Sequence, residues 1–153
     1  MRGRLCTSAA VLAALIFAAA AAAVQAETKV DPIVAVVNAG NDASKLSKTD
    51  LKNIYLGRQK TWSGGGTIRP YMRPTGAGAG FALLRNILKM TPARFRHHWQ
   101  ELELSGQGTA PKSIASARDV LDKVAAEEGA ISYLTESEAK NAGDKVKILK
   151  IPD

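Results

Sequence analysis

MRPTGAGAGF, residues 72–81, is the stretch that sets the expected fold. An alternating apolar run, residues 67–72, enters it and a helical run, residues 81–88, leaves it, which predicts a strand, a glycine-rich turn and a helix in that order. Such a turn directs free backbone N–H groups and the positive end of a helix dipole at one point, where an anion is favoured. The alternative is a flexible turn that lets the helix pack closely on a sheet.

The ligand expected at this turn is an oxyanion. Backbone amides from about Gly76 to Gly80 would hold it, and Thr75 Oγ and Arg73 would contribute further hydrogen bonds. The glycine spacing matches neither the nucleotide P-loop nor the dinucleotide-binding fingerprint. The turn therefore indicates a small anion in place of a nucleotide.

Strands and helices alternate along the chain. Residues 33–37, IVAVV, form a continuous apolar run that predicts a strand buried on both faces. Capping patterns and further apolar runs predict helix starts at residues 47–50, 91–92 and 116–119, and strands at residues 130–134 and 146–149. This alternation predicts an α/β domain with a mostly parallel sheet flanked by helices.

The first 26 residues are typical of a cleaved signal peptide. Arg2 and Arg4 precede a long apolar, alanine-rich segment, and small residues end it at Ala26. We expect cleavage there, a domain over residues 27–153, and a periplasmic or otherwise secreted location. An uncleaved membrane anchor is the alternative, since the apolar run is long.

Composition restricts the chemistry of the exported chain. Cys6 is the only cysteine and would leave with the leader, so we expect neither a disulfide nor thiol chemistry. Loss of Arg2 and Arg4 would lower the formal net charge of +7 by two. A mildly basic exported domain suits anionic small ligands, anionic lipid or cell-wall polymers. We expect no nucleic-acid partner.

No pattern indicates catalysis, a cofactor or a metal. His97 and His98 are adjacent, and neighbouring helical residues point about 100° apart, which does not suit one shared ion. The acidic pair Glu127 and Glu128 precedes a helix-ending glycine and is interpreted as a solvated helix end. No serine or other nucleophile has an assignable base. The chain is therefore predicted not to be an enzyme.

Two polar loops are further candidates for ligand contacts. Residues 105–109, SGQGT, are small and rich in hydrogen-bond donors, so this loop could add amides and hydroxyls to the same ligand. Residues 38–41 follow a buried strand, which is where α/β sheets usually place ligand loops. Both loops could equally be ordinary solvated turns.

Four motifs together resemble the phosphate-binding proteins of the phosphate ABC transporter. LKNIYLGRQKTW, residues 51–62, is similar to a helix followed by Leu-Gly and Trp in that family. Residues 73–81 resemble its Arg…Ser-Gly-Thr phosphate loop, residues 105–109 its Gly-Lys-Gly loop, and residues 129–133 its Gly-Ala-Ile-Gly-Tyr strand. The motifs occur in the same order across about residues 33–135.

This resemblance implies a single lobe of a type 2 periplasmic-binding-protein-like fold that binds phosphate or a related oxyanion. The implied ligand residues are Arg73, Thr75, Gly76, Ala77 and Gly78, with Gly108 and Thr109. Two departures stand out. The family's proteins are about twice as long and have two lobes, and its loop serine and threonine are alanines at positions 77 and 79 here.

Two functions therefore remain open from the sequence. The first is an extracytoplasmic solute-binding module that takes phosphate or a related anion, with an ABC transporter permease or a membrane sensor as partner. The second is a regulatory or scaffolding module of the same fold that binds no ligand and acts through a protein partner. The missing hydroxyls at Ala77 and Ala79 favour the second, and the oligomeric state is open.

Overall fold

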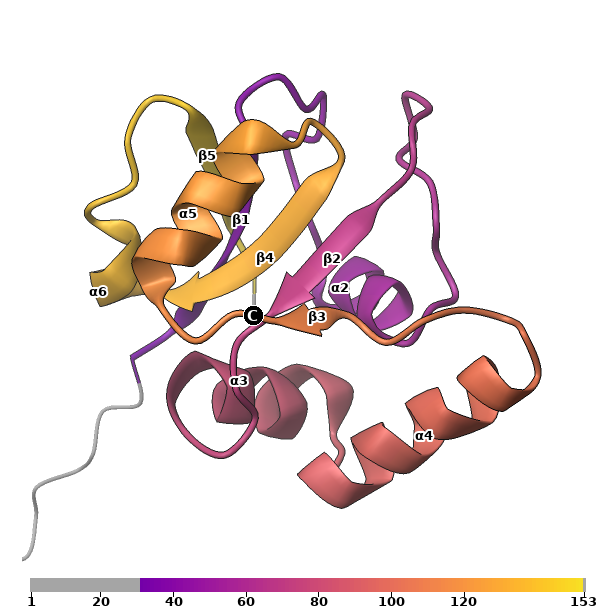
Figure 1. Cartoon of the computed structure of the whole chain (residues 1–153). Coiled ribbons are helices and arrows are strands. Elements are labelled where there is room, and N and C mark those ends of the chain that lie inside the picture. Colours follow the sequence, from indigo (N-terminus) through magenta and orange to yellow (C-terminus); the bar gives the residue numbers. More distant parts are fainter. Residues whose placement is uncertain (1–30, 153) are drawn as a thin grey trace, which may run out of the picture. The chain divides into compact units, whose positions relative to one another are not determined.

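Five strands form one sheet in the part of the chain that the computed structural model describes, residues 31–152 (Figure 1). Their order is β3-β2-β4-β1-β5. The bounds are β1 (Ile33–Asn38), β2 (Arg69–Met72), β3 (Lys112–Ser113), β4 (Ala130–Thr135) and β5 (Val146–Lys150). The predicted leader, residues 1–26, lies outside the described residues. Within residues 31–152 no helix has the length and apolar character needed to span a membrane.

Helices flank this sheet, and the predicted α/β class is confirmed. Their bounds are α2 (Lys48–Tyr55), α3 (Gly78–Ala82), α4 (Pro92–Leu104), α5 (Ala117–Ala126) and α6 (Glu136–Ala139), with the π-helix η2 (Leu83–Leu88) continuing α3. Figure 1 shows α5 against β4, and α3 and α4 in the segment between β2 and β3. α3 and η2 together form the helix that was predicted after the glycine-rich turn.

The sheet is mixed because β1 alone runs against the other strands. β2 is parallel to β3 and β4, whereas β1 is antiparallel to both of its neighbours, β4 and β5. Two of the four strand pairings are parallel, so the sheet is mixed, and the prediction of a mostly parallel sheet holds for β3, β2 and β4. A continuous apolar run predicts burial on both faces, but it carries no information on strand direction.

The direction of β1 places two candidate ligand loops at different edges of the sheet. The carboxyl end of β1 lies at the edge where β2 and β4 begin, and the carboxyl ends of β2, β3 and β4 lie at the opposite edge. Residues 38–41 therefore do not lie beside the turn that follows β2.

Two apolar clusters cover the two faces of the sheet. From β1, Ala35 and Val37 pack with residues of α2, η2 and α4, whereas Val34 and Val36 pack with residues of α5. All four side chains are buried, and the same alternation recurs in β4. This arrangement explains the unbroken apolar run in the sequence, since both faces of the strand are covered.

The predicted helix starts agree with the structure. Ser47 and Asp50 form the complete capping box of α2, and Thr91 caps α4 with Pro92 at its first turn. At α5 only the Ser116 half of the predicted box forms. Each cap supplies an acceptor for a backbone N–H that the helix itself leaves without a partner.

We expect Leu51→Ala to lower the free energy of unfolding by about 2–5 kcal/mol, because Leu51 is fully buried on α2 and its loss leaves a cavity. Leu104→Ala is the matched control, since Leu104 is 89% exposed on α4 and its change is expected to cost less than about 0.5 kcal/mol. Urea unfolding followed by circular dichroism measures both. Equal losses would contradict the core described above.

Candidate functional site

The glycine-rich turn leads from the carboxyl end of β2 directly into an uncapped helix. α3 begins at Gly78, and its N-cap residue, Ala77, makes no side-chain hydrogen bond to the helix. Every other α-helix within residues 31–152 has a hydroxyl cap, from Ser47, Thr91, Ser116 or Thr135. The first amides of α3 thus have no side-chain acceptor, and an external anion could fill that position.

Close backbone packing shapes the turn. A Cβ at Gly80 would lie 2.1 Å from the carbonyl oxygen of Pro74, so only glycine lets the first turn of α3 approach the chain that precedes it. Gly78 adopts a left-handed backbone with φ +57°. Gly76, by contrast, faces open space. The turn is therefore folded back onto its own helix, and its glycines are not interchangeable.

Arg73 follows β2 and is already engaged by other parts of the chain. Its Nη2 lies 2.9 Å from Oε1 of Glu138 on α6, and its Nη1 donates to the carbonyl oxygens of Ile114 and Ala115. The side chains of Arg73 and Glu138 are 15% and 30% exposed. Nε of Arg73 is buried and has no partner among the described residues. The guanidinium thus keeps one donor unused.

Tyr133 fixes the backbone of Arg73. Its hydroxyl accepts from the Arg73 N–H at 3.1 Å and donates to the Arg73 carbonyl oxygen at 3.4 Å. Burial raises the pKa of Tyr133 far above its ordinary value, so the hydroxyl remains protonated and can serve both roles. Tyr55 packs edge-on against this ring, with 5.3 Å between ring centroids. The start of the turn is therefore rigidly positioned.

The structure brings together only part of the predicted ligand set. Arg73, Thr75, Gly76, Ala77 and Gly78 share one turn at the carboxyl edge of β2. Gly108 and Thr109 precede β3, which runs parallel to β2, so they lie toward the opposite edge.

The segment that lies beside Arg73 is residues 113–115, and not the predicted Gly108 and Thr109. Ile114 N–H donates to the Met72 carbonyl oxygen at 2.8 Å. β3 is only two residues long, and the sequence alone gave no signal that located it. Glu138 was also missed, although Thr135 and Glu138 have the capping-box spacing that places it at the start of α6.

The two histidines and the acidic pair take part in local contacts. His97 Nδ1 lies 3.5 Å from Oε1 of Glu101 on the exposed face of α4, and His98 Nε2 lies 3.1 Å from the Leu56 carbonyl oxygen. Within residues 31–152 no cluster of three or more His, Cys, Asp or Glu side chains could hold a metal ion. Hydrogen bonds from Lys123 and Tyr71 lower the pKa of the Glu127 carboxyl.

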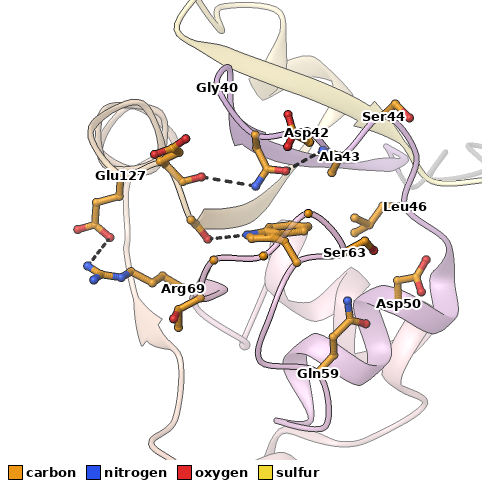
Figure 2. Close-up of a pocket in the computed structure, with 18 of the residues that line it drawn as sticks. Gly40, Asp42, Ala43, Ser44, Leu46, Asp50, Gln59, Ser63, Arg69 and Glu127 are labelled. Carbon is orange, nitrogen blue, oxygen red and sulfur yellow. Dashed lines mark hydrogen bonds and ion pairs between the residues drawn. The ribbon is translucent and has the colours of Figure 1, made fainter.

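A cleft of about 900 Å³ lies at the other edge of the sheet, where β1 ends and β2 and β4 begin (Figure 2). Its walls come from residues 40–46, residues 62–67 and residues 126–129. This cleft was not predicted, because its three loops are brought together only by the reversed direction of β1.

Residues 8–151 match the model of a protein family described as a PBP superfamily domain. The chain belongs to this family. The PBP-like family that the sequence motifs predicted is thereby confirmed. No curated protein matches this PBP-family chain in sequence.

Several solved structures with a similar fold have descriptions from phosphate transport. One is described as a phosphate ABC transporter substrate-binding protein with bound phosphate, from Clostridium perfringens, at 21% identity and a TM-score of 0.61. Others are an ABC-type phosphate transport receptor from Vibrio cholerae, at 16% and 0.57, and PstS from Borrelia burgdorferi, at 15% and 0.62. These identities support the fold alone.

The PBP-family chain spans less than half the length of these relatives. The three matches cover 79%, 79% and 80% of this chain but only 45%, 46% and 48% of the other chains. This coverage agrees with the predicted single lobe.

We expect Gly80→Ala to lower the free energy of unfolding by about 1–3 kcal/mol, because the added Cβ would collide with the Pro74 carbonyl oxygen. Gly76→Ala is the control, since a Cβ there meets nothing within 4 Å. Thermal and urea unfolding measure the difference. A Gly80→Ala protein as stable as Gly76→Ala would refute the close packing of the turn.

Proposed function

We propose that this chain is an extracytoplasmic solute-binding module that takes phosphate or a related oxyanion at the turn formed by residues 73–78. The observation that carries the proposal is the uncapped start of α3, whose N-cap Ala77 lies four residues after Arg73 in the same turn. Free amides at a helix start favour a compact anion, and a guanidinium in the same turn could add charge to the site. Phosphate is favoured over other anions because the similar structures belong to phosphate-transport proteins.

Each ligand contact would come from a different kind of group. The amides from Gly76 onward and the Thr75 hydroxyl would donate hydrogen bonds. Arg73 would contribute its positive charge through Nη2 of the guanidinium, which now pairs with Glu138. A hydrogen bond to a charged group contributes about 1.5–3 kcal/mol. Ala77 and Ala79 contribute no hydroxyl, so we expect affinity below that of a site with serine and threonine there.

The proposed function also includes an extracytoplasmic location and a membrane-protein partner. The leader expected at residues 1–26 would export the chain, and an ABC transporter permease or a membrane sensor would then receive the loaded module. The similar structures are of substrate-binding proteins, not enzymes, which agrees with a binding role.

A second candidate is a module of the same fold that acts through a protein partner without a ligand. The Arg73–Glu138 ion pair favours it, because the charge that would attract an anion is already neutralised. Crosslinking in the periplasm would then recover a membrane sensor or transporter component. If no partner is recovered and phosphate raises the melting temperature, this candidate is excluded.

We expect calorimetric titration of the purified protein with phosphate to show saturable binding, with Arg73→Ala weaker by about tenfold or more. Thr75→Val removes the one side-chain hydroxyl of the proposed site and should weaken phosphate binding by about tenfold. Chloride at equal ionic strength is the control. The absence of heat at millimolar phosphate for the wild type would refute the phosphate proposal.

Glu138→Gln is expected to tighten phosphate binding by about tenfold or more, because it removes the carboxylate that competes for Arg73. The glutamine side chain can still accept from Thr135 N–H, so the capping box of α6 is kept. Glu136→Gln, at an exposed position of α6, is the matched control. Equal affinities of Glu138→Gln and the wild type would show that Glu138 does not compete with the anion.

A further inference from the structure

The cleft at the edge where β1 ends has the size of a small-molecule site. Its volume of about 900 Å³ falls within the range usual for ligand pockets. In Figure 2, Asp42 and Ser44 lie at the top of the cleft, Gln59 lies at the bottom, and Ser63 lies between them. The glycine-rich turn lies at the opposite edge of the sheet, so the two sites are separate.

Hydrogen bonds pin one wall of this cleft, residues 40–46. The Asn41 side chain is buried, accepts from the Ala43 N–H at 2.8 Å and reaches the Glu128 carbonyl oxygen at 3.5 Å. Lys147 Nζ donates to the Asn41 carbonyl oxygen at 2.7 Å. A wall held in this way pays little ordering cost when a ligand binds.

The opposite wall is held just as closely. A Cβ at Gly129 would lie 2.2 Å from the Thr67 carbonyl oxygen, so the segment before β4 packs directly on the 62–67 loop. The Gly129 carbonyl oxygen accepts from the Trp62 indole N–H at 3.3 Å and from the Arg69 N–H at 2.9 Å. Trp62 also packs against the core, and the half-buried remainder of its ring lines the cleft. The cleft therefore contains a fixed aromatic surface.

The polar groups of the cleft carry both signs of charge. Asp50 and Glu127 are used inside the protein, by the α2 cap and by Lys123 with Tyr71. The carboxylates of Asp42 and Glu128 and the ammonium of Lys45 are exposed, with no ion pair among the described residues. The hydroxyls of Ser44 and Ser63 and the amide of Gln59 complete the set of donors and acceptors.

We propose that this cleft binds a saccharide unit. The apolar face of a sugar ring would pack on Trp62, and its hydroxyl groups, which both donate and accept, would bond to the carboxylates, hydroxyls and amide around it. Two free carboxylates disfavour an anion, whereas the exposed ammonium of Lys45 disfavours an organic cation. A wholly apolar ligand would leave these polar groups without partners.

Tryptophan fluorescence provides the test. The chain has two tryptophans, and Trp99 is a buried residue of α4 outside the cleft, so a ligand in the cleft should change the emission of Trp62. We expect saturable changes with glucose, N-acetylglucosamine or their disaccharides. Co-sedimentation with insoluble cell-wall glycan tests whether the bound saccharide unit is part of a polymer. Binding in either arm supports the proposal.

Substitutions of the cleft residues test what each contributes to saccharide binding. Trp62→Phe should abolish the fluorescence change, and the double variant D42N/E128Q should weaken binding measured by calorimetry by about tenfold or more. Asp122→Asn, at an exposed position of α5 outside the cleft, is the matched control. Circular dichroism verifies that each variant is folded. No response to any saccharide in either arm, or equal affinity of D42N/E128Q and the wild type, would overturn the proposal.

Discussion

Buried hydroxyl groups hold the carboxyl end of β2 to the neighbouring strand β4. The backbone ladder between these strands covers only two residues of β2 and stops at a proline. Beyond it, the Tyr71 carbonyl oxygen accepts from Tyr55 at 2.8 Å and from Ser132 at 3.0 Å, and Tyr133 bonds the backbone of Arg73. A buried carbonyl without a donor costs about 1–3 kcal/mol. These bonds therefore fix the point at which the strands part and the glycine-rich turn begins.

The reversed strand β1 determines how the remaining polar groups are distributed. Because it ends where its neighbours begin, its loop meets the loops that precede β2 and β4, and the cleft forms there. The other edge is left to the turn, the segment after β3 and the start of α6. One sheet thus presents two chemically distinct edges: an uncapped helix start beside Arg73 at one, and an indole among groups of both charge signs at the other.

Local patterns predicted local structure well. Ser47 and Thr91 start helices as expected, and the run at residues 33–37 is buried on both faces, because capping and burial depend on neighbouring residues. The direction of β1 depends on pairing with β4, almost a hundred residues later, and no local pattern encodes it. The same holds for the Arg73–Glu138 pair, whose two residues lie 65 positions apart in the sequence. Residues 105–109 have the composition of a ligand loop. The direction of β3, however, places them toward the edge of the sheet opposite the glycine-rich turn.

The Arg73–Glu138 pair has a consequence for how such a site responds to concentration. Glu138 belongs to the same chain, so its carboxylate faces the guanidinium at an effective concentration on the order of millimolar or above. In the proposed site, an incoming oxyanion would gain the full attraction of Arg73 only after displacing this internal competitor. Such a site would stay empty while the anion is scarce and fill once it is plentiful. It would suit reporting abundance better than scavenging traces.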